Sequence, residues 1–167
     1  QTSSVENSKD FSLANLIKTR DSRFEASFYH KPTVKSKSCY LYPVKFIPRS
    51  ALKYLEVKGG APDVEYTSVN NLNGYPVLRY AEVLLNWIEA KAELSTLGAG
   101  SVTQADIDLS VNKIRNRPLA QEAVERGVQK TAPMELAALP DDPSRDSDVP
   151  ALLWEIRRER RMEFALE

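Results

Sequence analysis

The sequence predicts an all-α protein whose first half holds an irregular, partly β insertion. Two observations predict this class. After Pro76, apolar residues recur with the 3.6-residue period of amphipathic helices, whereas residues 1–76 show no sustained helical period and are divided by proline and glycine. No internal repeat or Gly/Ser linker divides the chain. We therefore expect one unit, residues 1–167, with an irregular β-containing part at 1–76 and a helical part at 77–167.

Composition limits the possible functions. The 167 residues are 42% hydrophobic and 28% charged, which suits a globular domain, and 23 basic residues balance 23 acidic ones. A chain of zero net charge gives no reason to expect a nucleic-acid partner. The chain has no apolar run of the roughly 20 residues that span a bilayer. Its polar start lacks the apolar core of a signal peptide.

The first thirty residues predict a short helix and then a strand. Apolar residues between 11 and 17 have near-helical spacing, and Asp10 or Ser12 could cap that turn. A turn is expected at 21–23. From Arg23 to Tyr29, polar and apolar residues alternate as in a strand.

Residues 31–76 predict turns and short extended pieces. A strand is expected around Tyr40–Phe46, and Pro43 would make it an edge strand. The segment also holds five of the seven tyrosines: Tyr40, Tyr42, Tyr54, Tyr66 and Tyr75.

The second half predicts three helices. The first runs from Val77 to about Leu97, with Pro76 before it and Gly98 at the position of a left-handed C-cap. Its expected buried stripe is Val77, Tyr80, Ala81, Leu84, Leu85, Ile88 and Ala92. The second begins near Thr103, where Asp106 completes a capping box, and ends before Pro118. A short link predicts that these two helices form an antiparallel hairpin.

A long connection and a last helix follow. Residues 118–148 are either functional or disordered, with a helical turn expected at 122–128. The last helix starts near Asp148, which could cap it, and its expected buried face is Val149, Leu152, Leu153, Ile156 and Phe164.

Few residues suggest catalysis or a metal site. Cys39 and His30 fit no known nucleophile–base signature, and one His and one Cys do not complete a tetrahedral metal shell. We therefore expect no metal and no cofactor.

Three glutamates of the last helix, Glu155, Glu159 and Glu163, could be read as hydrolase carboxylates. The neighbouring arginines favour an ion-pair face instead, because they keep carboxylates ionised. Arg160, near the apolar stripe, is expected to pair with a carboxylate such as Glu82 or Glu89.

Two segments carry a resemblance to a known family. The stretch Arg79–Ala90, RYAEVLLNWIEA, resembles the R-Y-A-E-V-L-L-N-Y-A-E-A segment of the SusD/RagB family, and Ile156–Glu167, IRRERRMEFALE, resembles its I-R-x-E-R-R-x-E-F-x-x-E segment. Weaker similarities lie in the same order: Asp21-Ser22-Arg23-Phe24 is similar to a D-P-R turn, and Ile114-Arg115-Asn116-Arg117 to an I-R-x-R helix end.

The resemblance implies a tetratricopeptide-like fold of helix hairpins and a fragment from the middle and later part of a family member. It also implies a binding protein, not an enzyme. Such proteins bind glycans or oligosaccharides on the outer membrane of Bacteroidetes. They carry a lipid anchor, for which Cys39 does not match, and they act with a SusC-like TonB-dependent transporter in nutrient uptake.

The loop tyrosines Tyr40, Tyr42, Tyr54 and Tyr66 are the candidate ligand-binding residues. A tyrosine ring can stack on the C–H face of a sugar, while its hydroxyl bonds to sugar hydroxyls. Two alternatives remain open: a helical protein–protein scaffold without a small ligand, and a glycoside hydrolase that uses Glu155 and Glu159.

Overall fold

The computed structural model describes residues 11–31 and 40–167, and this part of the chain is helical. The chain forms two compact units. The first unit comprises the described residues up to Val77 together with 120–129, and the second comprises 78–119 and 130–165 with Glu167.

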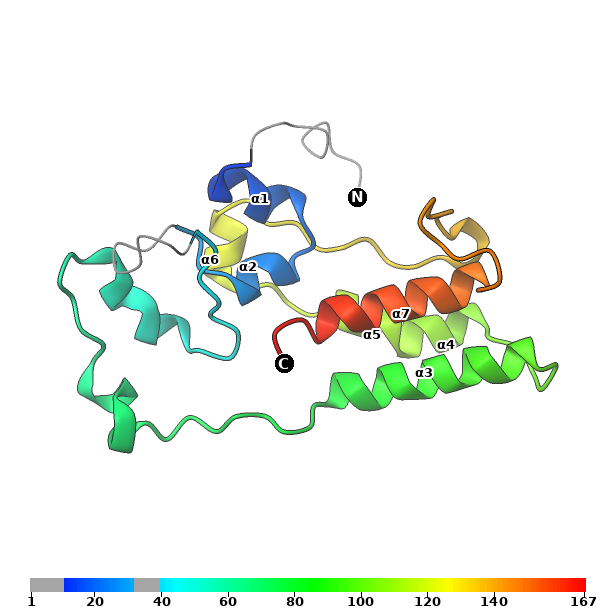
Figure 1. The fold of residues 1–167 in the computed structure, drawn as a ribbon, viewed down its shortest axis with the longest axis horizontal. Helices are drawn as coiled ribbons and strands as arrows, with labels where there is room; N and C mark the ends of the chain where they lie inside the picture. The colour runs from blue at the N-terminus through cyan, green and yellow to red at the C-terminus, as the bar shows by residue number, and fades with distance from the viewer. Residues whose placement is uncertain (1–10, 32–39) are drawn as a thin grey trace. The chain divides into compact units, whose positions relative to one another are not determined.

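The helices of each unit are short except for two in the second (Figure 1). The first unit contains α1 (Leu13–Thr19), α2 (Arg23–Ser27), α6 (Gln121–Glu125) and the 3₁₀ helices η1 (Arg49–Glu56), η2 (Val64–Tyr66) and η3 (Ser68–Asn70). The second contains α3 (Tyr80–Thr96), α4 (Gln104–Leu109), α5 (Val111–Arg115), η4 (Leu136–Ala138) and α7 (Ala151–Glu163).

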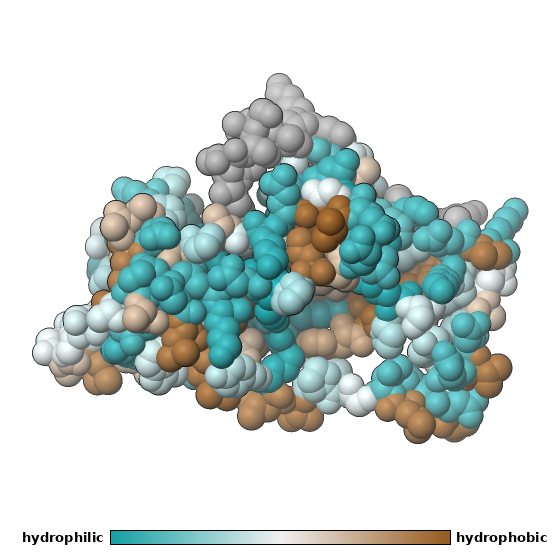
Figure 2. Space-filling view, turned by 180° about the vertical axis from the view of Figure 1, so that it is seen from behind, coloured by the Kyte–Doolittle hydropathy of each residue, from teal (hydrophilic) through white to brown (hydrophobic). Residues whose placement is uncertain are grey.

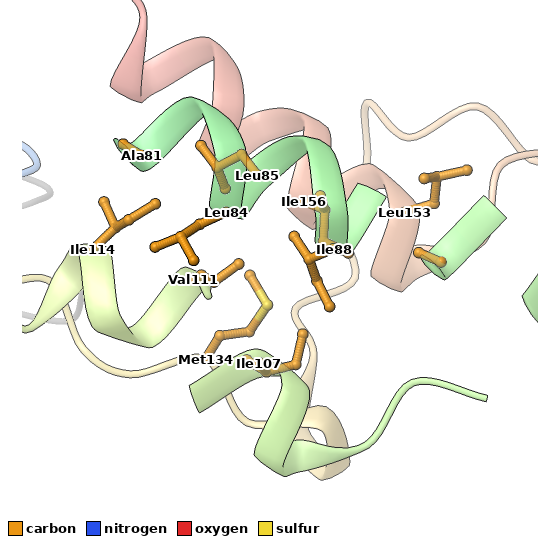
Figure 3. Packing of buried hydrophobic residues seen from close by; sticks show 11 residues of the cluster. Ala81, Leu84, Leu85, Ile88, Ile107, Val111, Ile114, Met134, Leu153 and Ile156 are labelled. Carbon is orange, nitrogen blue, oxygen red and sulfur yellow. The ribbon is translucent and has the colours of Figure 1, made fainter. Parts of the chain in front are cut away.

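The second unit is built on one hydrophobic core between α3, α4–α5 and α7. Figure 3 shows these side chains converging from the helices. The core residues are Ala81, Leu84, Leu85, Ile88, Ala92, Ile107, Val111, Ile114, Met134, Leu153 and Ile156. α3 contacts α7, α4 and α5, which confirms the predicted helix hairpin. Burial of each large aliphatic side chain stabilises the fold by roughly 1.5–3 kcal/mol.

α3 begins three residues later than its sequence predicts and ends where expected. Arg79 is the N-cap of the helix and has an extended backbone, so Val77 lies outside α3. The prediction that Val77 and Tyr80 are buried is wrong, because both side chains are exposed. At the other end, Gly98 has φ +78°, and the amides of Gly98 and Ala99 donate to the carbonyls of Ser95 and Leu94. This is the Schellman motif that a C-terminal glycine favours.

The second predicted helix is two helices, although its start is as expected. The Thr103 hydroxyl accepts from the Asp106 amide, and the Asp106 carboxylate accepts from the Thr103 amide, so the capping box is confirmed. At Ser110 the backbone leaves the helical region, and the buried Ser110 hydroxyl donates to the Asp106 carbonyl at 2.7 Å. A serine that bonds back to the preceding turn competes with the helical hydrogen-bond ladder.

Part of the predicted long loop is held in place by two amide side chains. Buried Asn112 accepts from the Met134 amide at 2.6 Å and donates to the Met134 carbonyl at 3.1 Å. Gln104 accepts from the Leu136 amide and donates to the Met134 carbonyl. The predicted helical turn is present as α6.

The start of α7 differs from its prediction. The helix begins at Ala151 with Pro150 as its N-cap, so the predicted cap at Asp148 is wrong. Its buried face is as expected, with Leu153 and Ile156 in the core.

The predicted strands are also wrong: the described residues contain no strand, only one β-bridge between Phe28 and Pro43. Arg23–Ser27 forms α2, and Asp21 at its start accepts hydrogen bonds from the Arg23 amide and guanidinium. Two hydrogen bonds flank the bridge, from Tyr29 to Tyr42 and from Val44 to Ser27. Pro43 has no amide hydrogen with which to extend the pairing.

One face of α3 remains apolar and exposed. Tyr80, Val83, Trp87, Ala90, Leu94 and Leu97 are all exposed, and they follow one another at alternating spacings of three and four residues. We call these six residues the α3 stripe. Figure 2 shows apolar side chains along the lower edge of the molecule, where α3 runs. This spacing is that of the a and d positions of a helix that pairs with another helix.

Candidate ligand-binding site

An aromatic cavity lies in the first unit, between η1 and the segments on either side of it. Five aromatic side chains contribute to its wall, together with two asparagine amides and a lysine. The lining residues are Tyr42, Lys45, Phe46, Ile47, Pro48, Ala51, Leu52, Tyr54, Pro62, Tyr66, Asn71, Asn73, Gly74 and Tyr75. Its volume of about 320 Å³ lies at the lower end of the range for small-molecule sites.

The 3₁₀ geometry of η1 explains how one segment serves both the cavity and the core. Side chains three residues apart lie in line in such a helix. Pro48, Ala51 and Tyr54 form one such row and line the cavity. The next row, Leu52 and Leu55, is buried in the small core of this unit, against which Tyr54 also packs. The core therefore fixes the wall of the cavity.

An unusual turn presents Phe46 to the cavity. Phe46 has φ +67°, a left-handed conformation that is rare for a residue with a side chain. Its ring meets the Tyr75 ring edge-on, with centroids 5.7 Å apart and planes at 87°. The Lys45 ammonium lies 5.6 Å from the centroid of the Phe46 ring. Backbone strain of this kind is often found at binding sites.

The tyrosine hydroxyls of the cavity wall are held by hydrogen bonds. The Tyr66 hydroxyl and the Ser50 hydroxyl lie 2.7 Å apart. Burial and then the neighbouring Tyr42 raise the pKa of Tyr54, so it remains a neutral phenol. Asn71 accepts from the Asn73 amide at 3.0 Å, which closes the turn that carries both side chains. The wall thus offers flat apolar rings with neutral donors and acceptors between them.

The structure brings three of the four candidate tyrosines together. Tyr42, Tyr54 and Tyr66 line the cavity. Tyr40 does not line it, and its hydroxyl donates to the Phe11 carbonyl at 3.0 Å. Sequence reasoning missed Tyr75, which belongs to the same tyrosine-rich segment, and Phe46, because no sequence signal marks its left-handed turn.

A second cavity of the first unit, about 420 Å³ in volume, has a charged wall that includes Glu25, Arg49 and Arg126. Arg49 donates two hydrogen bonds to the buried Glu25 carboxylate, at 2.7 and 2.6 Å, and Arg126 donates one at 2.6 Å. Burial by itself raises the pKa of Glu25, but the two guanidinium groups more than offset this and lower it. These three groups satisfy one another, as expected of a structural ion cluster.

His30 lies on the wall of the same cavity, with Nε2 3.6 Å from a carboxylate oxygen of Glu56. Burial, followed by the charges of Arg126 and Lys31, lowers the pKa of His30. Cys39, the other member of the suggested pair, lies outside the described residues. Within the described ranges, no cluster of His, Cys, Asp and Glu could hold a metal ion.

The glutamate row of α7 is a buried ion-pair face, as the neighbouring arginines predict. Glu155 accepts from Arg158 at 2.6 Å, and Glu159 accepts from Arg115 at 2.7 Å. Glu163 accepts from Arg79 at 2.8 Å and from Arg117 at 2.6 Å. Each carboxylate is occupied by a guanidinium.

Arg160 contacts Asn86 and lies 3.6 Å from a Glu89 oxygen, which confirms Glu89 as one of its two predicted partners.

No helix in the described part of the chain is long and apolar enough to cross a membrane.

Comparison with known families now identifies the class of protein. The model of the SusD family matches residues 3–167, so the chain belongs to the SusD family, a family of binding proteins. No curated protein and no solved structure gave a significant match.

Three of the four family-like segments meet in the second unit. Arg79 belongs to the first long segment, Arg115 and Arg117 to the I-R-x-R helix end, and Glu159 and Glu163 to the last segment. These residues form ion pairs that join the start of α3, the end of α5 and α7. These three segments are therefore scaffold, whereas residues 21–24 and the aromatic cavity lie in the first unit.

Proposed function

We propose that this protein binds a glycan or oligosaccharide in the aromatic cavity, as the surface component of a TonB-dependent nutrient uptake system. The observation that carries the proposal is the cluster of Tyr42, Phe46, Tyr54, Tyr66 and Tyr75 around one cavity. Aromatic faces suit the C–H faces of sugar rings. Membership of the SusD family supports the same function.

The partners and location are part of the proposal. A SusC-like transporter receives the bound glycan. A lipid anchor of the full-length protein holds the binding protein at the outer-membrane surface. The protein acts by binding, not by catalysis. The described residues that line the cavity include no carboxylate pair, and the glutamates of α7 already bond to arginines.

Calorimetric titration with a panel of oligosaccharides tests the binding proposal. We expect heat of binding without cleavage of the sugar. Tyr66→Ala and Tyr75→Ala should each lose about tenfold in affinity, because a tenfold loss corresponds to about 1.4 kcal/mol, which is of the size expected for removing one aromatic ring that packs on the sugar. Tyr40→Ala is the matched control, and it also tests the sequence-based prediction for Tyr40. Unchanged affinity in both cavity variants, with folding verified by circular dichroism, would remove the cavity from the proposal.

The α3 stripe favours the second candidate function, a protein–protein scaffold. Six exposed residues with a and d spacing form an apolar surface that suits a partner helix. We propose that this face contacts the transporter.

Leu94→Gln should weaken copurification with the transporter severalfold, whereas Thr96→Gln, on the same helix but outside the stripe, should not. Retained transporter binding with no response to any glycan would favour the scaffold alone.

A further inference from the structure

The charges around the aromatic cavity carry an inference about the class of glycan, which rests on the proposed function. Among the described residues that line the cavity, Lys45 is the one charged side chain. The wall contains no aspartate and no glutamate. A bound anion therefore meets a positive charge and no negative one within the lining.

Lys45 lies beside the aromatic pair of the cavity wall. Its ammonium is 5.6 Å from the centroid of the Phe46 ring, and Phe46 itself is fixed edge-on against Tyr75. A sugar ring on this aromatic pair has its substituents within reach of the flexible lysine. An ammonium serves as a point charge for carboxylate or sulfate oxygens.

The remaining polar groups of the cavity are neutral. Asn71, Asn73 and the tyrosine hydroxyls can bond to sugar hydroxyls but do not repel an anion. The nearby acidic residues Asp63 and Glu65 are exposed and line a separate, shallow depression with Val64 and Leu72. Carboxylates would strengthen the binding of neutral sugar hydroxyls through charge-assisted hydrogen bonds, and this wall has none.

We propose that the aromatic cavity selects an acidic glycan, with uronate or sulfate groups, and that Lys45 is the residue that determines this selectivity. Lys45 contacts the anionic group, while one ring of the perpendicular Phe46–Tyr75 pair stacks on the sugar ring that carries it. Neutral oligosaccharides of the same length bind more weakly at the same place.

The test compares ligands that differ only in charge. Trimers of galacturonate, glucuronate and mannuronate are titrated beside their methyl esters, and a sulfated galactan trimer beside the unsulfated one. We expect each acidic trimer that binds to do so five- to tenfold more tightly than its neutral counterpart. Added salt should reduce the difference, because salt screens the attraction between the half-buried Lys45 and the anionic group. A preference confined to the uronates or to the sulfated trimer identifies which anionic group is bound.

Variants assign the preference to Lys45. Lys45→Gln should abolish the five- to tenfold preference by lowering the affinity for the acidic trimers, whereas Lys45→Arg should retain the preference. Lys58→Gln, an exposed lysine outside the cavity lining, is the matched control.

Three results overturn the inference. Equal affinity for acidic and neutral trimers disproves the selectivity but leaves glycan binding in place. A preference that persists in Lys45→Gln disproves the role of Lys45 and also leaves glycan binding in place. If no trimer binds, acidic or neutral, then the proposed function itself fails and the inference fails with it.

Discussion

At the scale of single residues, each unit contains buried glutamates that are hydrogen-bonded to arginines. Glu25 in the first unit and Glu159 in the second are almost inaccessible to solvent, at 3% and 1% exposure, and each is bonded to arginine. A buried carboxylate without a partner is strongly unfavourable, so each arginine is needed once its glutamate is buried. These clusters therefore specify which segments meet.

Glu25 should make the stability of the protein depend on acid pH. Its pKa in the folded protein lies below the ordinary value of 4.5, so its contribution is fully present above about pH 4.5. That contribution is lost as the pH falls through the folded pKa, because the unfolded chain then binds the proton more readily. Glu25→Gln should lower the free energy of unfolding by roughly 2–4 kcal/mol at pH 7.

Urea denaturation between pH 7 and pH 3 measures this effect. The difference between wild type and Glu25→Gln should shrink toward the acid end, while Glu65→Gln, at an exposed position of η2 in the same unit, should be neutral throughout. A difference that stays constant with pH would show that the pKa of Glu25 is not lowered.

At the scale of elements, capping residues predict boundaries well where their bonds are local. The capping box of α4 and the glycine C-cap of α3 lie within a few residues of sequence, and both are present as expected. The break between α4 and α5 occurs at Ser110, which is fully buried. The late start of α3 occurs at Arg79, which pairs with the distant Glu163.

Thr103→Ala should lower the free energy of unfolding by about 1 kcal/mol, because the amide of Asp106 loses its side-chain acceptor. Chemical denaturation of the variant measures the change, and helical circular dichroism of the native state should remain nearly the same. Ser101→Ala, two residues earlier and exposed, is the control and should have little effect. An equal loss in both variants would contradict a capping role.

At the scale of the whole molecule, the second unit depends on ion pairs between segments far apart in the sequence. The ion pair of Glu159 and Arg115 joins α7 to α5 across 44 positions, and that of Glu163 and Arg79 joins α7 to α3 across 84. The side chains of Arg115 and Glu159 are 8% and 0% exposed, so solvent screens this pair very little.

Glu159→Gln should destabilise the second unit by about 3–5 kcal/mol, because it leaves a buried guanidinium without its countercharge. Hydrogen exchange should therefore accelerate in α3, α5 and α7. Amides of α1 and α2, in the other unit, report whether the effect stays local. Glu135→Gln, an exposed glutamate of the same unit, is the control. Unchanged exchange in α5 would contradict the structural role of this pair.

The sequence by itself determined the helical class, the hairpin of α3 with α4–α5, the family and three of the cavity tyrosines. Helical periodicity, capping and family motifs are local in the chain, so they can be read without coordinates. Tyr42, Tyr54 and Tyr66 lie in loop-rich sequence, where binding residues are frequent, and they line the cavity, whereas the same reasoning also selects Tyr40, which does not.

Only the tertiary structure decided what the local pattern left ambiguous. The alternation from Arg23 to Tyr29 suits a strand, but the buried Glu25 and its two arginines, one of them 101 positions away, stabilise a helix instead. The placement of Phe46, Tyr75 and Lys45 around one cavity likewise depends on a left-handed turn and on η1. Contacts between residues distant in sequence determine such features, and no short-range pattern encodes them.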